Sequence, residues 1–100
     1  MSDEIGQKVI FKYTLNTFEG PINEIEMPQG AEILNVQSQN DTPTIWAKCD
    51  KANEYESRYF AIVGTGKDFG KEGLPEDDEM EYLDSCICGN FVWHIHEVKK

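Results

Sequence analysis

Apolar and polar residues alternate along most of the chain, and this period of two predicts β-strands with one face toward a core. In residues 8–15 the apolar face carries Val9, Phe11, Tyr13 and Leu15, and lysines occupy the other face. By the same pattern, the expected strands cover residues 8–15, 23–27, 31–39, 44–49, 57–64, 80–87 and 91–98. Turn residues separate them. The fold class is therefore mainly β, a small antiparallel barrel or sandwich of about six to seven strands with at most one short helix.

Two connections are long enough to need their own interpretation. The polar segment 50–56 is either one helical turn or a loop, because no apolar period decides it. Residues 65–79 combine clusters of charge with three glycines and are expected to form one long acidic loop. The length suffices for one core but not for two, so residues 1–100 are expected to be a single domain, with 1–7 as a flexible N-terminus.

Three bulky side chains break the alternation. Residues 57–64 are apolar on both faces, which is typical of a central strand covered on both sides. Phe60 and Ile62 lie on the face that strict alternation would assign to water, and Trp46 does the same in residues 44–49. Such side chains either cover a second core layer or form an exposed patch for a partner or for self-association, so a homo-oligomer stays open.

The charge of the chain narrows the classes of partner. The formal net charge is -10, with nineteen acidic and nine basic side chains. Nucleic acids and anionic membranes would be repelled, which argues against direct binding to either. A protein that imitates DNA with its carboxylates is not excluded by this argument. The sequence has no apolar stretch of membrane-spanning length and starts without an export signal, so a cytoplasmic protein is expected.

A pair of cysteines and a pair of histidines lie near the C-terminal end. They can be interpreted either as a metal site or as ordinary core thiols and surface imidazoles. Cys86 and Cys88 share one face of a predicted strand, and His94 and His96 share one face of the next. Together they would make a set of two thiolates and two imidazoles, although neither pair has the Cys-x2-Cys spacing of a zinc knuckle. The preferred interpretation is core thiols and surface imidazoles, with no metal. No nucleophile signature accompanies the histidines, so no catalytic residue is assigned.

The run Gly64-Thr65-Gly66-Lys67 resembles part of a phosphate-binding loop. It lacks the complete G-x4-G-K-[ST] pattern and the following helix, which favours a strand exit made possible by glycine. The run can still bring backbone amides close to an anion.

Five blocks of residues carry a resemblance to a known family. They are I-F-K-Y-x-L from Ile10, M-P-x-G-A-x-I-L-x-V-Q-x-Q from Met27, P-x-I-W-A from Pro43, R-x-F-x-I-x-G-T-G from Arg58 and F-V-W-H-I from Phe91. With these blocks, residues 8–98 resemble a family of small uncharacterised proteins encoded by tailed bacteriophages. The resemblance implies a phage accessory protein that acts in the host cytoplasm. Members often carry histidine directly after the G-T-G block, where this chain has Lys67, so no site involving that histidine carries over.

The expected function is binding, without a catalytic residue or a cofactor. The leading hypothesis is a noncatalytic binder or inhibitor of a host bacterial protein, with Trp46 among the contacts. The alternative is capture of a small anionic ligand such as a nucleotide. In that case Gly64, Thr65 and Gly66 would approach the ligand and Arg58 would pair with its charge. Phe60 is a further candidate for contact with the partner or ligand. The remaining alternatives for the function are an acidic DNA mimic and a metal-dependent hydrolase.

Overall fold

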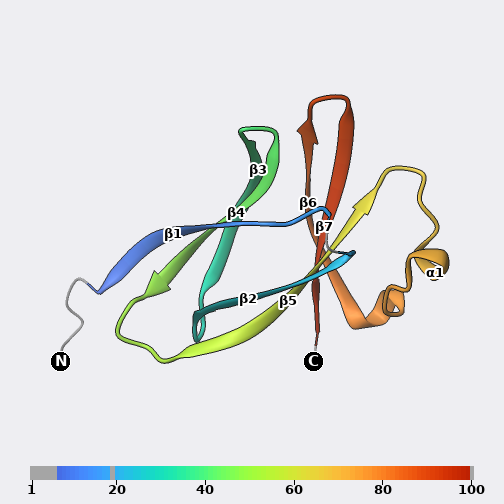
Figure 1. The fold of residues 1–100 in the computed structure, drawn as a ribbon. Coiled ribbons are helices and arrows are strands. Elements are labelled where there is room, and N and C mark those ends of the chain that lie inside the picture. The colour runs from blue at the N-terminus through green and yellow to red at the C-terminus, as the bar shows by residue number, and fades with distance from the viewer. Residues whose placement is uncertain (1–6, 19, 100) are drawn as a thin grey trace.

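The computed structural model describes residues 7–18 and 20–99, so most of the expected flexible N-terminus lies outside the described residues. Seven strands within these residues form two antiparallel sheets (Figure 1). In chain order they are Lys8–Thr14 (β1), Ile22–Pro28 (β2), Glu32–Gln39 (β3), Thr42–Asp50 (β4), Tyr55–Gly64 (β5), Met80–Cys88 (β6) and Phe91–Val98 (β7). Between β5 and β6 lie a short helix, Phe69–Glu72 (α1), and a 3-10 turn, Asp77–Glu79 (η2).

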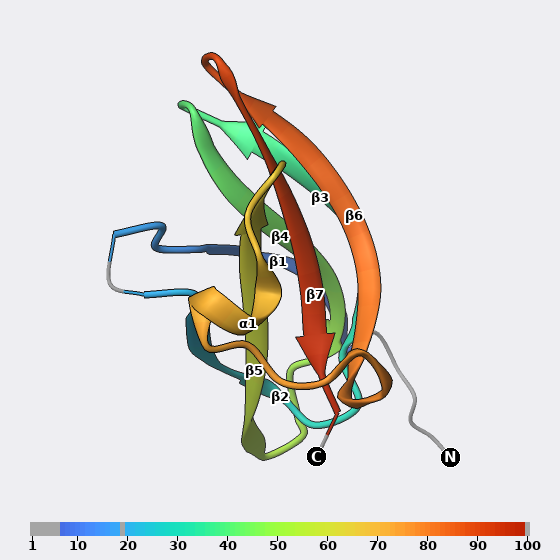
Figure 2. The same ribbon diagram turned by 90° about the vertical axis from the view of Figure 1, so that its right-hand side faces the viewer.

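The two sheets pack face to face as a sandwich. One sheet has the strand order β1-β4-β3 and the other has the order β2-β5-β7-β6. The edge strands β3 and β6 run side by side without pairing (Figure 2), so the sheets do not close into a barrel. The mainly β prediction is confirmed, and the structure decides between the two architectures that the sequence left open.

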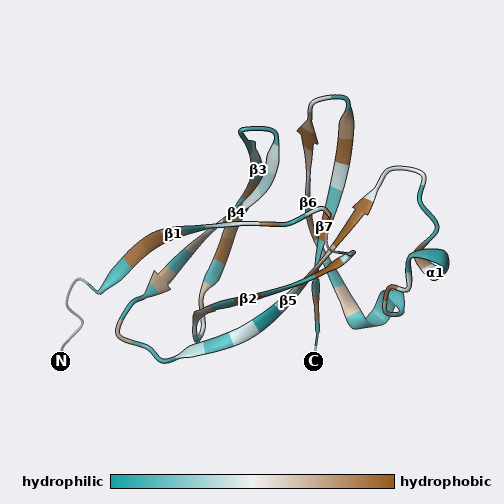
Figure 3. Cartoon of the chain, viewed as in Figure 1, coloured by the Kyte–Doolittle hydropathy of each residue, from teal (hydrophilic) through white to brown (hydrophobic). Residues whose placement is uncertain are grey.

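One hydrophobic core joins the sheets. On β1, β2 and β4 its residues are those that period-two patterning placed inward, whereas on β5 the core face is the one that the alternation assigned to water. Leu15, Met27, Ile45, Phe60 and Ile95 are among its fully buried side chains. The apolar stretches fall on the strands, whereas the segment around α1 is largely hydrophilic (Figure 3). Burial of such side chains stabilises the fold by about 1.5–3 kcal/mol each.

Strand β5 is covered on both faces, as its sequence predicts. It lies between β2 and β7, and Phe60, Ala61, Ile62 and Val63 are all buried. Phe60 and Ile62 belong to the main core between the sheets, so the assignment of their face to water is wrong and they form no exposed patch. The outer face is covered by the segment 65–79, which passes in front of β5 and β7 (Figure 2).

The segment 65–79 is more ordered locally than the single long loop that the sequence predicts. The side chain of Asp68 accepts a hydrogen bond from the backbone amide of Lys71 at 3.1 Å and so caps α1. Gly73 follows with φ +76, a left-handed conformation that ends the helix without a Cβ clash. Residues 51–53 form only a turn, so the one short helix lies between β5 and β6.

The two hairpin turns agree with their sequences. Asn40 and Asp41 connect β3 to β4 with φ +54 and +61, the positive values that a two-residue type I′ turn requires. Gly89, with φ +61, is the first residue of the turn between β6 and β7. None of the described helices has the length and apolarity of a membrane span.

Candidate functional site

A cavity opens at the end of the sandwich where β5 finishes. It has a volume of about 660 Å³. Its walls come from the β1–β2 loop, the β3–β4 turn, the exit of β5 and the β6–β7 hairpin, which the fold brings together from distant parts of the chain (Figure 1). We call it the end cavity. Its lining includes Phe18, Asp41, Gly64, Lys67, Phe91 and Trp93.

Aromatic rings make the apolar part of the end cavity. Phe18 is 95% exposed and Phe91 is 65% exposed, although both are large hydrophobic residues. The rings of Phe91 and Trp93 lie with their centroids 6.0 Å apart and their planes inclined by 31°. Such rings offer faces on which a flat apolar group can pack. These residues were not among the sequence candidates. Phe18 lies in a loop, where no alternation marks it, and Phe91 and Trp93 fit the ordinary alternation of β7.

The exit of β5 forms a tight turn at the polar side of the end cavity. The backbone amide of Lys67 donates to the carbonyl of Gly64 at 3.1 Å. Gly66 has φ +87, which favours glycine at this place in the turn. A Cβ on Gly64 would lie 3.6 Å from the indole of Trp93, so the turn packs closely on that ring. Lys67 is exposed and forms no ion pair within the described part of the chain.

A chain of hydrogen bonds crosses three strands beside this turn. The hydroxyl of Thr65 lies 2.7 Å from Nε2 of His94, and Nδ1 of His94 lies 3.0 Å from the hydroxyl of Tyr82. Thr65 lines the end cavity. The sequence presented Thr65 and His94 as unrelated candidates, and only the pairing of Gly64 with Trp93 between β5 and β7 brings them together.

The cysteine and histidine pairs do not form one site. Cys86 and Cys88 are buried in the core with their sulfur atoms 3.8 Å apart, and burial raises the pKa of the Cys86 thiol to about 12. His94 and His96 lie on the opposite face of the same sheet, because Cys86 pairs with Trp93 and not with a histidine. Within residues 7–18 and 20–99 no cluster of side chains suits a metal ion. The core thiols are confirmed.

The prediction of two surface imidazoles is wrong for His96. This side chain is only 8% exposed, because α1 lies over it, and the rings of Phe69 and Tyr82 contact it edge-on at centroid distances of 5.6 and 5.1 Å. Burial lowers the pKa of His96, and Nδ1 has no hydrogen-bond partner among the described residues. His94 is half-buried, with both ring nitrogens in the hydrogen bonds described above.

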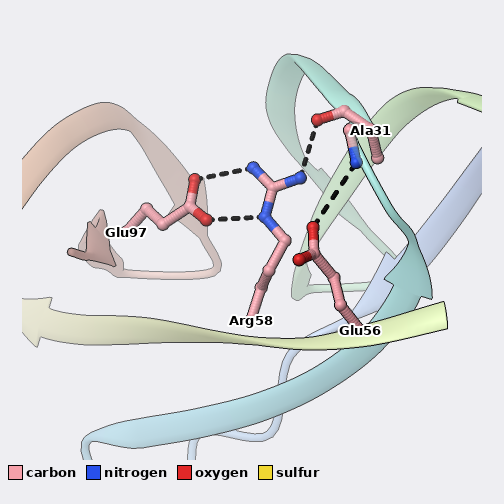
Figure 4. Close-up of polar contacts among 5 residues, drawn as sticks. Ala31, Glu56, Arg58 and Glu97 are labelled. Carbon is pink, nitrogen blue, oxygen red and sulfur yellow. Dashed lines mark hydrogen bonds and ion pairs between the residues drawn. The ribbon is translucent and has the colours of Figure 1, made fainter. Parts of the chain in front are cut away.

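Arg58 does not belong to the end cavity. Gly64 is the sixth residue after Arg58, which places them about 20 Å apart along β5. The Arg58 guanidinium binds both carboxylate oxygens of Glu97, at 2.6 and 2.9 Å, and donates to the carbonyl of Ala31 at 2.7 Å (Figure 4). The hydrogen bonding of the guanidinium to the Glu97 carboxylate is the main reason that the pKa of Arg58 is raised. Three of its N–H donors are therefore engaged within the fold, which supports a structural role for this side chain.

Trp46 lies on another surface, the outer face of the three-stranded sheet. It is half-buried between Lys12 on β1 and Asn35 on β3, its partners in the ladders. Ile10 is 60% exposed and lies diagonally across the same face, at about 7–8 Å. Lys48, which pairs with Ile10, adds a second lysine to this surface. Of the two alternatives for Trp46, this position fits a surface patch.

Comparison with known proteins places the chain in a family but assigns no activity. No curated protein and no solved structure matches it. A family model described as "Domain of unknown function (DUF7352)" matches residues 6–100. Since this match spans nearly the whole sequence, the protein belongs to the DUF7352 family.

Proposed function

We propose that this protein binds a small organic anion in the end cavity. The observation that carries the proposal is the combination, in one cavity of about 660 Å³, of aromatic walls and a lysine that has no ion pair within the described residues. Small-molecule sites typically measure about 300–1,000 Å³ and combine apolar walls with a few polar groups. A ligand with a flat ring and a negative group would pack against Phe91 and Trp93 and place its charge near Lys67.

A nucleotide is one ligand class with both parts. Its base would lie against the aromatic rings, and its phosphate would lie near Lys67 and the turn at Gly66. Backbone amides of a glycine-containing turn can add to the attraction of an anion. The net charge of -10 opposes long polyanions, whereas a short ligand contacts few of these charges, namely Lys67 and, at the β3–β4 turn of the same cavity, Asp41. An aryl carboxylate satisfies the same two requirements.

Thermal unfolding with a panel of nucleotides and aryl carboxylates tests this proposal. A ligand at 100 times its dissociation constant stabilises the native state by about 2.7 kcal/mol. We expect such stabilisation for at least one anionic compound and its loss in Lys67→Ala. Lys51→Ala, which removes an exposed lysine from the β4–β5 turn, is the matched control and should behave as the parent protein. Equal stabilisation of both variants, or none by any compound, would contradict the proposal.

A second candidate function is binding to a host bacterial protein through the outer face of the three-stranded sheet. The observation that favours it is the apolar pair of exposed Ile10 and half-buried Trp46, flanked by Lys12 and Lys48 on an otherwise acidic protein. Aromatic residues that are partly exposed beside basic groups often dominate protein contacts. The resemblance to tailed-phage proteins makes a factor of the infected cell the class of partner, met in the host cytoplasm.

Affinity capture from bacterial lysate can separate this candidate from the first. A partner retained by the parent protein and by Lys67→Ala but lost by Trp46→Ala would support the outer-face surface. A partner lost only with Lys67→Ala would place the contact at the end cavity instead. Retention by both variants would reject this surface as the contact.

A further inference from the structure

The segment between β5 and β6 is tied to the sheet at its two ends. The amide of Thr65 donates to the carbonyl of Val92 at 3.2 Å, and the amide of Lys99 donates to the carbonyl of Glu79 at 2.7 Å. We call residues 68–79 the strap, because they pass in front of β5 and β7 (Figure 2). Before its last residue, the hydrogen bonds of the strap within the described chain join its own residues to one another.

The middle of the strap has few apolar contacts with the sheet. Only Phe69, Leu74 and Pro75 of the strap are half-buried, and its other residues are exposed. The ring of Phe69 contacts His96 edge-on at a centroid distance of 5.6 Å. A segment with few buried apolar contacts and exposed hydrogen bonds opens at a low cost in free energy. The contact of Phe69 with His96 is therefore important for holding the strap down.

His96 fits beneath the strap as a neutral imidazole. It is 8% exposed, Phe69 and Tyr82 press on it edge-on, and its buried Nδ1 has no hydrogen-bond partner among the described residues. Protonation would place a cation with an unpaired N–H group in this apolar contact, which is costly. Burial lowers the pKa of His96 for this reason.

The charges around His96 act in both directions. Asp77 on η2 favours the protonated ring and His94 on β7 disfavours it, but burial has the largest influence on the pKa of His96. Asp77 is exposed, so water weakens its attraction. The other ionisable side chains on the elements packed here are Tyr59 on β5, Tyr82 on β6, Asp68, Lys71 and Glu72 at α1, and Glu76, Asp78 and Glu79 at η2.

We propose that protonation of His96 releases the strap from the outer face of β5 and β7. The proton comes from solvent and binds the free ring nitrogen, and release lets water reach the imidazolium. Ala61 and Val63 pair with His96 and His94 and share their face, so release also exposes these two buried apolar residues. The ends of the strap stay attached. The inference goes beyond the proposed binding function and needs no ligand in the end cavity.

Titration of the imidazole signals by NMR tests the first half of the proposal. In the parent protein the pKa of His96 should lie below 6.5. Phe69→Ala should move this pKa toward 6.5, because water then reaches the ring. Lys71→Ala changes an exposed side chain of α1 and is the matched control that should leave the pKa unchanged. A parent pKa at or above 6.5, or the same pKa in Phe69→Ala, would overturn the proposal.

Hydrogen exchange tests whether the strap moves. The amide of Glu72 donates to the carbonyl of Asp68 at 3.0 Å, and α1 is too short to persist away from the sheet. After correction for the intrinsic rate, exchange of this amide should rise about tenfold from pH 7.5 to 5.5, because the open state takes up a proton that the closed state does not. His96→Phe should abolish the rise, whereas His94→Gln should keep it.

Two comparisons make the exchange experiment decisive. The amide of Ile62 donates to the carbonyl of Pro21 at 2.8 Å within the larger sheet and should exchange much more slowly than that of Glu72. Equal rates would show global unfolding and reject a local release. An equal rise in the parent protein and His96→Phe would assign the movement to other groups and also reject the proposal. If His96→Phe does not fold, the titration of Phe69→Ala, which keeps the histidine, still decides.

Discussion

The two ends of β5 carry cations in opposite situations. Near its start, Arg58 is largely buried and its guanidinium is bound by Glu97 and by the carbonyl of Ala31. Beyond its other end, exposed Lys67 lines the end cavity and has no ion pair within the described residues. A cation whose donors are satisfied inside the fold stabilises the structure, whereas a cation beside an aromatic cavity remains available to a ligand. The residue type alone does not distinguish these roles.

The largest effect is a loss of stability, and it is expected near the start of β5, where Arg58 is bound by Glu97. Arg58→Ala leaves the Glu97 carboxylate buried without its partner, since the two side chains are only 17% and 18% exposed. Removing one member of such a pair costs about 3 kcal/mol of unfolding free energy. Urea denaturation measures this loss. Ligand binding at the end cavity should persist at temperatures where the variant is folded.

A double variant sharpens the prediction for Arg58. Replacing both Arg58 and Glu97 by methionine removes the unpaired charge and should recover most of the stability lost in Arg58→Ala. If the double variant is as unstable as the single one, the loss comes from packing and not from the pair.

A smaller effect is expected at the end cavity, beyond the other end of β5, and it concerns the affinity for a ligand. Phe91→Ala should weaken a bound ring compound about tenfold, or about 1.4 kcal/mol, because the ligand loses one aromatic wall. The free energy of unfolding should change by less than about 0.5 kcal/mol, since Phe91 is 65% exposed. Titration calorimetry and urea denaturation measure the two quantities. A large loss of stability would show that this end, like the other, is part of the packed structure.

Gly66→Ala tests the turn that presents Thr65 and Lys67. An alanine at φ +87 costs about 1 kcal/mol, because its Cβ approaches the following carbonyl. Space is not the obstacle, since a Cβ at Gly66 meets nothing within 4 Å. We expect this loss in denaturation experiments, together with weaker stabilisation by an anionic ligand of the end cavity. Unchanged stability and unchanged ligand binding would mean that the turn tolerates the residue and that its geometry is not limiting.

The smallest effect is a pH dependence that arises between the two ends, at His96. Burial lowers the pKa of native His96 below its ordinary value of 6.5, with Asp77 opposing and His94 reinforcing the shift. As the pH falls through about 6.5, the unfolded chain takes up a proton that the native state does not. The free energy of unfolding should therefore decline from pH 7.5 to 5.5 and level once the pH lies below the native pKa. His96→Phe should flatten this decline, and an unchanged slope would assign it to other groups.

Strand positions could be predicted because they depend on local alternation. Val9, Phe11 and Tyr13 face the core as expected, and the apolar faces of β5 required cover on both sides. Which part of the chain covers the outer face of β5 could not be predicted. The segment 65–79 is polar and without a period, yet Phe69 within it packs against His96. A single apolar residue in a charged loop gives no signal until the fold places a partner beneath it.

The candidate site was predictable only in fragments. Thr65 and His94 each stood out, but 29 residues separate them in the chain, and their contact follows from the pairing of β5 with β7. Arg58 looked equally suitable for a ligand, and only the pairing of β5 with β7, which sets Glu97 diagonally across from it, shows that its guanidinium binds this carboxylate. Phe18 and Phe91 had no distinguishing pattern at all.

The sequence by itself determined the β class, the inward faces of β1, β2 and β4 and the turn at Asn40 and Asp41, because these follow from side-chain alternation and local backbone preferences. Tertiary structure alone decided that the sheets stack without closing, that the cysteines and histidines occupy opposite faces, and that the end cavity exists. These features depend on strand order and register, which join residues far apart in the chain, and no local pattern encodes which strands become neighbours.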